Sequence, residues 1–355
     1  MRDINTFRRV PALVAATLIA LCLLVGTYTV IASPAPRDRP DLGSPAAANS
    51  DGTTGWDSGW VFIANDTWRG FVHGLGYAPE LYAVEMWFLD LDDGYGLNRR
   101  YYGGAEVNGD GYGADWRRLT ANTIRVYRGQ EDTAADRVRI RVSVPPTPPD
   151  GDSGWTDIAP GDTMTFTHGL GITATELTVG MWFSSSSPLI GIHNVGYGGL
   201  AIDGDERMGG AYWHNLTSNT VQVTRYPDDQ LVDQVRLVVV HGTPPDYDSL
   251  VELGGWQSIV TGTNVFTHNL GWNPFMLTVR GECYSSAAGI NQWMAGGNHD
   301  WIDGWQGASL QNVTSDTVEI FRFPDDQVCP QARIRIWKRI RRVYLPLVLD
   351  SYGGS

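Results

Sequence analysis

The residues best suited to chemistry lie in an arginine-led acidic motif that occurs three times. The segment 225–229 (RYPDD) has a close copy at 322–326 (RFPDD) and a looser one at 128–132 (RGQED). Carboxylates accept paired hydrogen bonds from neighbouring hydroxyl groups, arginine donates such bonds, and an aromatic ring packs on the apolar face of a sugar. The same segment also suits a type I turn with the arginine paired across it. Each copy therefore predicts a sugar site or a turn, with candidate ligand residues Arg128, Glu131, Asp132, Arg225, Tyr226, Asp228, Asp229, Arg322, Phe323, Asp325 and Asp326.

A histidine motif recurs with nearly the same spacing. The pattern Phe-x-His-x-Leu-Gly occupies 71–76, 166–171 and 266–271, so its copies lie about 95 to 100 residues apart. No His-x-His or Cys-x-x-Cys accompanies His73, His168 or His268, as a metal site would require. We expect each histidine to bond the backbone of its own turn, with ion or ligand binding as the alternative.

The elements that position these motifs are strands. The spacing is too long for a solenoid and indicates three domains, at 57–144, 152–241 and 254–338. Apolar residues alternate with others along Leu177–Phe183, and Tyr82–Phe88 and Leu277–Cys283 repeat the pattern. We predict an all-β chain of three tandem six-stranded antiparallel β-sandwiches. In the second domain the expected strands are 154–158, 163–168, 177–183, 195–202, 220–225 and 234–240.

Tryptophan and cysteine predict further contacts. Trp87 and Trp182 fall on the outer face of their strands, which indicates either packing against a neighbouring repeat or a ligand platform. Trp116 and Trp213 are expected in a core or in a seam between repeats. Cys283 and Cys329 are the only cysteines after the first 32 residues, and we predict a structural disulfide that replaces an apolar contact of the other repeats.

The chain ends indicate export. Residues 1–32 carry arginines before a long apolar run, which predicts a signal peptide or an uncleaved membrane anchor. Residues 33–56 read as a flexible linker. The tail, 339–355, is either a last strand or a sorting signal, and it is similar to tails of exported proteins from some filamentous bacteria. We predict a secreted or cell-surface bacterial protein that meets the membrane only through an uncleaved N-terminal segment.

The net charge and the absence of catalytic motifs argue against nucleic-acid binding and enzyme activity. The net charge of -13 argues against nucleic acid as a partner. Acidic glycine loops at 90–94, 108–111, 203–206 and 298–300 have calcium-like ligand types but lack a full ligand set, so we expect solvated turns, with calcium binding as the alternative. No other cofactor is expected. The sequence has no nucleophile elbow, metalloprotease helix motif or phosphate loop, which predicts a protein that is not an enzyme.

The repeat unit resembles the H-type lectin domain. In the second repeat the resemblance rests on Thr163–Phe166, Glu176–Phe183, the Asn-Leu-Thr turn at 215–217, and Val221–Val240. It implies trimers of sandwich domains that bind N-acetylgalactosamine or galactose near the subunit contacts. Three copies in one chain then imply an intramolecular pseudo-trimer, although Pro-Asp-Asp stands where those lectins have aromatic and histidine contacts. We expect a lectin-like protein that binds carbohydrate or a cell-surface glycan multivalently; the alternative is a structural or adhesive surface protein without sugar binding.

Overall fold

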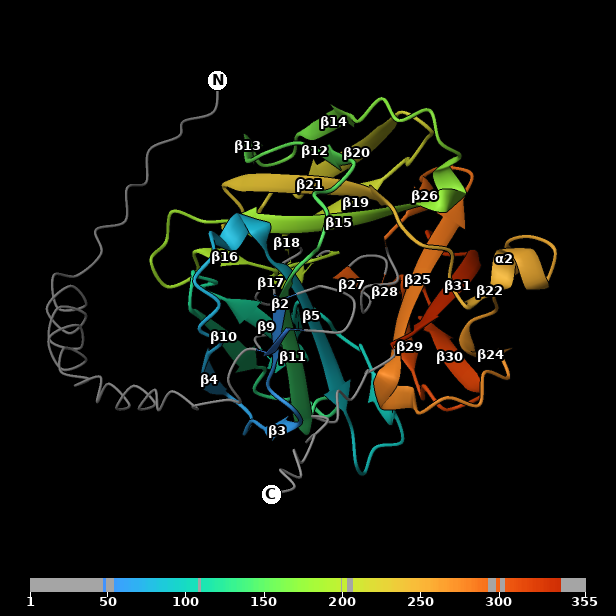
Figure 1. The fold of residues 1–355 in the computed structure, drawn as a ribbon, viewed down its shortest axis with the longest axis horizontal. Helices are drawn as coiled ribbons and strands as arrows, with labels where there is room; N and C mark the ends of the chain where they lie inside the picture. The colour runs from blue at the N-terminus through green and yellow to red at the C-terminus, as the bar shows by residue number, and fades with distance from the viewer. Residues whose placement is uncertain are drawn as a thin grey trace, which may run out of the picture. The chain divides into compact units, whose positions relative to one another are not determined.

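The computed structural model describes residues 47–48, 54–107, 110–198, 200–202, 207–292, 298–300 and 304–339. These residues form an all-β protein with three similar pairs of antiparallel sheets (Figure 1). We call 54–144 repeat 1, 151–241 repeat 2 and 247–338 repeat 3. Among the described residues, no helix is both long enough and apolar enough to cross a bilayer. The predicted export segment lies outside the described residues, as does the tail beyond Arg339.

Each repeat has a larger sheet built around two long neighbouring strands. The order is β2-β11-β5-β6 in repeat 1, β12-β21-β15-β16 in repeat 2 and β22-β31-β25-β26 in repeat 3. A short strand also pairs with the second strand of each order, and β1 (Ala47–Ala48) extends the first sheet beside β2. The bounds are β2 (Thr54–Asp57), β3 (Val61–Phe62), β5 (Ala83–Leu89), β6 (Leu97–Asn98), β11 (Arg137–Val144), β12 (Gly151–Asp152), β13 (Thr156–Asp157), β15 (Leu177–Ser184), β16 (Ile192–His193), β21 (Gln234–His241), β22 (Tyr247–Asp248), β23 (Gln257–Ser258), β25 (Leu277–Ser285), β26 (Gly289–Asn291) and β31 (Gln331–Lys338).

A three-stranded sheet faces each larger one. Its strand order is β4-β10-β9, β14-β20-β19 or β24-β30-β29 in the successive repeats. The bounds are β4 (Thr67–Val72), β9 (Ala114–Arg117), β10 (Thr123–Arg128), β14 (Thr163–Thr167), β19 (Ala211–His214), β20 (Thr220–Arg225), β24 (Gly262–Thr267), β29 (Ala308–Gln311) and β30 (Thr317–Arg322). We refer to these three sheets as the small sheets.

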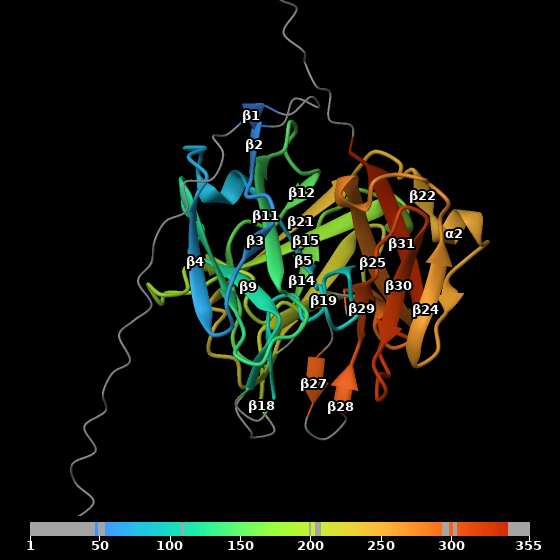
Figure 2. The same cartoon turned by 90° about the horizontal axis from the view of Figure 1, so that it is seen from below.

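Short hairpins and helical turns complete each repeat. The hairpins are β7 (Ala105–Val107) with β8 (Asp110–Tyr112), β17 (Leu200–Ile202) with β18 (Arg207–Gly209), and β27 (Asn298–Asp300) with β28 (Gly304–Gln306). In Figure 2, β18, β27 and β28 lie on the same side of the molecule, and β7, β17 and β27 contact one another. The helical turns are η1 (Pro79–Leu81), η2 (Ala174–Glu176), η3 (Pro274–Met276) and α2 (Ser249–Glu252).

The core of each repeat lies between its two sheets, because alternate strand residues point there. Along β15, Leu177, Val179, Met181 and Phe183 are buried while the residues between them are half-buried. The neighbouring strand β21 contributes Val235, Leu237 and Val239, and β20 contributes Val221 from the facing sheet. Burying one such side chain stabilises the fold by about 1.5–3 kcal/mol. The predicted alternation is thus confirmed.

The disulfide prediction is confirmed as well. Cys283 and Cys329 are bonded, with their Cα atoms 4.9 Å apart, and both are fully buried in the core of repeat 3. Cys283 occupies the strand position of Phe88 and Phe183, since these three residues pair with Ala332, Val138 and Val235 on the neighbouring strand. The covalent bond therefore takes the place of an aromatic contact.

The strand map extends the prediction in two places. Each repeat begins before its expected first residue: β2 starts at Thr54 and buries Trp56, and repeat 3 starts at β22, followed by α2. Four strands of repeat 2, β12, β16, β18 and β19, were not expected. The omission of β19 matters most, because it places Trp213 in the core.

Backbone hydrogen bonds join each repeat to another in the same way. The amide of Leu119 in repeat 1 donates to Ile192 of repeat 2 (3.2 Å), that of Leu216 in repeat 2 donates to Ile290 of repeat 3 (3.3 Å), and that of Val313 in repeat 3 donates to Leu97 of repeat 1 (3.0 Å). We call these three contact zones the seams. They involve β9 with β16, β19 with β26, and β29 with β6.

The outward tryptophans of the larger sheets take part in contacts between repeats. Trp87 of repeat 1 is 4% exposed and belongs to the core cluster of repeat 3, and Trp182 of repeat 2 packs on the core of repeat 1. Of the two alternatives for these residues, packing against a neighbour is the one observed. Trp116 and Trp213 lie in the cores of their own repeats.

Candidate functional site

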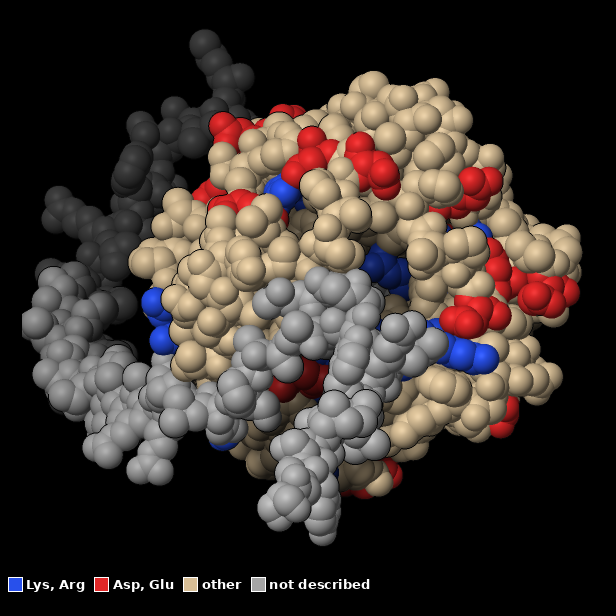
Figure 3. Space-filling view, in the orientation of Figure 1, with Lys and Arg blue, Asp and Glu red and all other residues tan. Residues whose placement is uncertain are grey.

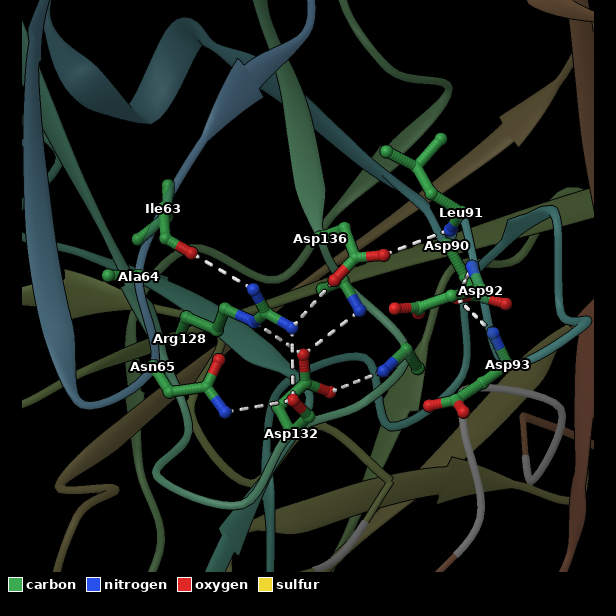
Figure 4. Close-up of polar contacts among 12 residues, drawn as sticks. Ile63, Ala64, Asn65, Asp90, Leu91, Asp92, Asp93, Arg128, Asp132 and Asp136 are labelled. Carbon is green, nitrogen blue, oxygen red and sulfur yellow. Dashed lines mark hydrogen bonds and ion pairs between the residues drawn. The ribbon is translucent and has the colours of Figure 1, made fainter.

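The three arginine-led motifs form buried clamps. In each, Nε of the arginine donates to Oδ2 of the aspartate four residues on, at 2.7 Å in all three copies. Nη2 donates to the backbone oxygen of that aspartate. Nη1 donates to the carbonyl of an isoleucine that follows β3, β13 or β23, namely Ile63, Ile158 or Ile259. The pairs are Arg128–Asp132, Arg225–Asp229 and Arg322–Asp326, and we call them the clamps. Figure 4 shows the first of them.

The aspartate of each clamp is saturated by backbone amides. Asp229 accepts from Gly210 (2.6 Å), Leu231 (3.2 Å) and Val232 (2.9 Å) in addition to its arginine. It is 2% exposed, and its arginine is 7% exposed. A carboxylate with all its oxygens engaged in the protein cannot take up a sugar hydroxyl. The contacts of Arg128, Asp132, Arg225, Asp229, Arg322 and Asp326 are those of the turn alternative, and we carry none of these six residues forward as a sugar ligand.

The remaining candidates of the motif differ in their exposure to solvent. Asp228, Asp325 and Glu131 are exposed at the corner of the turn. Tyr226 is half-buried, with its ring 5.2 Å from that of Tyr212. Phe323 is 2% exposed. Asp228, Asp325 and Glu131 are thus open to a ligand in solution, Tyr226 is partly so, and Phe323 is closed to it.

The histidine motif has the turn role that we expected. Nδ1 of each histidine accepts the amide of the leucine two residues on, at 3.4, 3.4 and 3.3 Å for His73, His168 and His268. Burial lowers the pKa of all three, opposed by the nearby backbone of the Thr-rich turn. Neutral imidazoles at pH 7 suit this accepting role.

A surface that the sequence did not single out is the outer face of the small sheet in repeat 1. The rings of Trp68 and Tyr127, on neighbouring strands, lie 4.6 Å apart. The Arg117 guanidinium lies 4.6 Å from the Trp68 ring and binds Asp115 through two hydrogen bonds. The Tyr127 hydroxyl donates to Asp66 (2.9 Å), and burial, followed by Asp66, raises the pKa of Tyr127 to about 12.

The equivalent faces of the other repeats differ. In repeat 2 the Tyr212 ring lies 5.2 Å from that of His214, whose Nε2 bonds the Thr224 hydroxyl at 2.9 Å. In repeat 3 the Arg100 guanidinium of repeat 1 lies 4.7 Å from the Phe321 ring and donates to Gln311 at 3.2 Å. The third face is therefore occupied by the protein's own arginine, whereas Trp68, Tyr127 and Tyr212 keep partial exposure.

One acidic loop brings three carboxylates together. Oxygens of Asp90, Asp92 and Asp136 lie within 4.8 Å of one another. Asp90 already accepts backbone amides of Asp92 (3.1 Å) and Asp93 (3.0 Å), and Asp136 binds Arg128 (3.2 Å), as Figure 4 shows. The charge of Asp136 is the main cause that raises the pKa of Asp92. The loop offers oxygen ligands for calcium, but much of its charge is compensated by the protein. Of the other predicted calcium loops, 203–206 lies outside the described residues, as does the first half of 108–111.

Comparison with known proteins gives no match: no family model, no curated protein and no solved structure corresponds to this chain.

Proposed function

We propose that this chain is a non-catalytic extracellular protein that binds carbohydrate, such as a cell-surface glycan, through its three unequal repeats. The observation that carries the proposal is the outer face of the small sheet in repeat 1. It combines a half-exposed tryptophan, a neighbouring tyrosine and an arginine–carboxylate pair. An aromatic surface packs on the apolar face of a sugar, and the half-buried Arg117, which the buried Asp115 holds in place, offers donors to hydroxyl groups.

We further propose that the repeats close into a pseudo-trimer. The support is that the seams run from repeat 1 to 2, from 2 to 3 and from 3 to 1, with equivalent backbone bonds in each. A second set of contacts joins the same three pairs of repeats in the opposite direction. Arg139 binds Asp57 and donates to Phe275 of repeat 3 (3.4 Å), Arg236 binds Asp152 and donates to Glu80 of repeat 1, and Arg333 binds Asp248 and donates to Thr175 of repeat 2.

In this arrangement the three faces would present different surfaces to a glycan. Repeat 1 offers an aromatic face with an arginine–carboxylate pair, repeat 2 a face with Tyr212 and His214, and repeat 3 a face covered by Arg100. Repeat 1 is accordingly the main binding face, and repeat 2 adds to it through effective concentration.

A glycan array tests the proposal. Trp68→Ala should lose most of the binding that the wild-type chain shows, and Tyr212→Ala a smaller part. Phe62→Ala is the matched control, because Phe62 is an aromatic residue of the same repeat, 63% exposed and outside the cluster. Equal binding by Trp68→Ala and Phe62→Ala would exclude this face as the site. Loss of binding only in a triple alanine variant of Glu131, Asp228 and Asp325 would move the site to the exposed corners.

The alternative is a structural or adhesive surface protein without sugar binding. The ion pairs of the clamps and of Arg139 and Arg333 favour this alternative, because their charged groups bind other parts of the protein. A wild-type chain that binds no glycan while remaining folded would support this alternative.

A further inference from the structure

One strand position of the larger sheets differs in charge among the three repeats. Glu85 on β5, Gly180 on β15 and Arg280 on β25 occupy equivalent places, opposite Arg141, Val238 and Arg335 on the neighbouring strand. These residues lie on the side of the sheet away from its own core, since Met86, Met181 and Val279 next to them are buried there.

Most of the charges around this position are paired. Glu85 binds Arg141 (3.3 Å) and Arg339 (2.6 Å). Arg335 binds Glu282 and donates to the Leu177 carbonyl of repeat 2 (3.1 Å). Burial opposes ionisation of Glu85, but the charges of Arg339, Arg141 and Arg99 lower its pKa to about 2. Around this position the guanidinium groups outnumber the carboxylates: Arg99, Arg141, Arg280, Arg335 and Arg339 stand against Glu85 and Glu282.

Arg280 and Arg99 are the exceptions. Within the described part of the chain, the Arg280 side chain makes no hydrogen bond or ion pair, and the Arg99 side chain only stacks on the rings of Tyr102 (4.2 Å) and Trp87 (5.4 Å). The Nε groups of Arg99 and Arg335 are buried donors without a partner among these residues. A buried donor left unpaired is costly, so such groups call for a ligand or water.

The Arg280 side chain is reached by solvent although protein surrounds it. Its side chain is exposed to solvent, yet desolvation is the main cause that lowers its pKa, followed by the charges of Arg335 and Arg99 and opposed by Glu85 and Tyr197. The interacting groups come from all three repeats. A solvent-accessible group surrounded by protein lies in a hollow, and Figure 3 shows a hollow near the middle of the molecule with Lys or Arg atoms at its bottom.

We propose that Arg280, with Arg99 and Arg335, binds a small oxyanion in this hollow: a sulfate, a phosphate or the carboxylate of an acidic sugar. A guanidinium group donates two parallel hydrogen bonds to such a group, and the partly desolvated setting strengthens the attraction. The site is separate from the small-sheet face of the proposed function, and its occupancy does not depend on that function.

Isothermal titration of the full chain with sodium sulfate, sodium phosphate and sodium glucuronate tests this proposal, with sodium chloride at matched ionic strength as the reference. The wild-type chain should bind at least one of these oxyanions at one site per chain, and Arg280→Gln should weaken binding roughly tenfold or more. Tighter binding of glucuronate would identify an acidic sugar, and tighter binding of sulfate or phosphate an inorganic ion; both support the site.

Two further variants keep the test decisive. Arg137→Gln makes the same change of charge on an exposed arginine and should leave binding unchanged. Glu85→Gln removes a competing negative charge and should tighten binding. Heat signals no larger than those of chloride for the wild-type chain, or equal binding by Arg280→Gln and Arg137→Gln, would overturn the proposal.

Discussion

The clamps and the outer faces of the small sheets share the strands β10, β20 and β30, but the clamp residues are the same in all three repeats and the outer-face residues are not. All three clamps have the same arginine, the same aspartate and the same 2.7 Å bond. On the outer face, Tyr127, Thr224 and Phe321 occupy one equivalent position. What repeats within this chain is the chemistry that builds the sandwich, and what differs is the surface that it offers to others.

The largest expected effect is loss of a clamp. Asp229→Ala leaves a buried arginine without its carboxylate, which should lower the free energy of unfolding by about 3–5 kcal/mol. Asp228→Ala, its exposed neighbour in the same turn, should change it by no more than about 0.5 kcal/mol. Urea unfolding of both variants measures the difference; similar losses for the two would show that the turn does not depend on the clamp.

The disulfide distinguishes repeat 3 from the other two and should have the next largest effect. It closes a loop with a sequence separation of 46 residues. The double variant Cys283→Ala/Cys329→Ala should lose about 2–4 kcal/mol. Replacement by the residues of repeat 2, Cys283→Phe/Cys329→Val, should recover part of that loss, because Phe183 and Val232 are fully buried at the corresponding positions. No recovery would contradict the equivalence of the three cores.

Acid should weaken the ion pairs that Asp57 makes with Arg139 and Arg141, the two arginines that donate to the Phe275 carbonyl of repeat 3. Burial acts to raise the pKa of Asp57, but Arg139, Arg141 and the Gly59 amide together lower it from 3.8 to about 2. A lowered carboxyl pKa stabilises the fold above the unfolded value and loses this contribution as the pH falls from about 4 to 2. The loss is about 1–2 kcal/mol for this group. Asp57→Asn should flatten the fall in stability over that range; an unchanged slope would assign it to other carboxylates.

Removal of divalent cations should have the smallest effect. Asp90 accepts backbone amides and Asp136 is paired with Arg128, so the acidic loop is held by the protein itself. We expect the same unfolding midpoint in EDTA as in calcium. A midpoint raised by calcium in the wild-type chain but not in Asp92→Asn would show that the loop binds the ion.

The strands and the disulfide could be predicted because alternation and paired cysteines are local signals. The role of the clamps was also within reach, since Arg225 continues the inward series of Val221 and Val223 along β20. The residue types alone left both a sugar site and a turn open, because the same side chains suit both roles. The strand β19 was missed because it is only four residues long and follows two glycines. The Trp68–Tyr127 face and the residues around Arg280 depend on pairing across strands and repeats, which spacing along one chain does not reveal.

The different residues at the equivalent positions 85, 180 and 280 show that a tandem chain can vary one repeat alone, which an assembly of identical subunits cannot do. An assembly of three copies of one gene product must place any charge near its symmetry axis three times over, with mutual repulsion. Joining the copies end to end allows each to mutate alone, so a single cation can stand beside an anion and a gap. In the proposed pseudo-trimer, covalent linkage would thereby let selection act on one residue of the centre at a time.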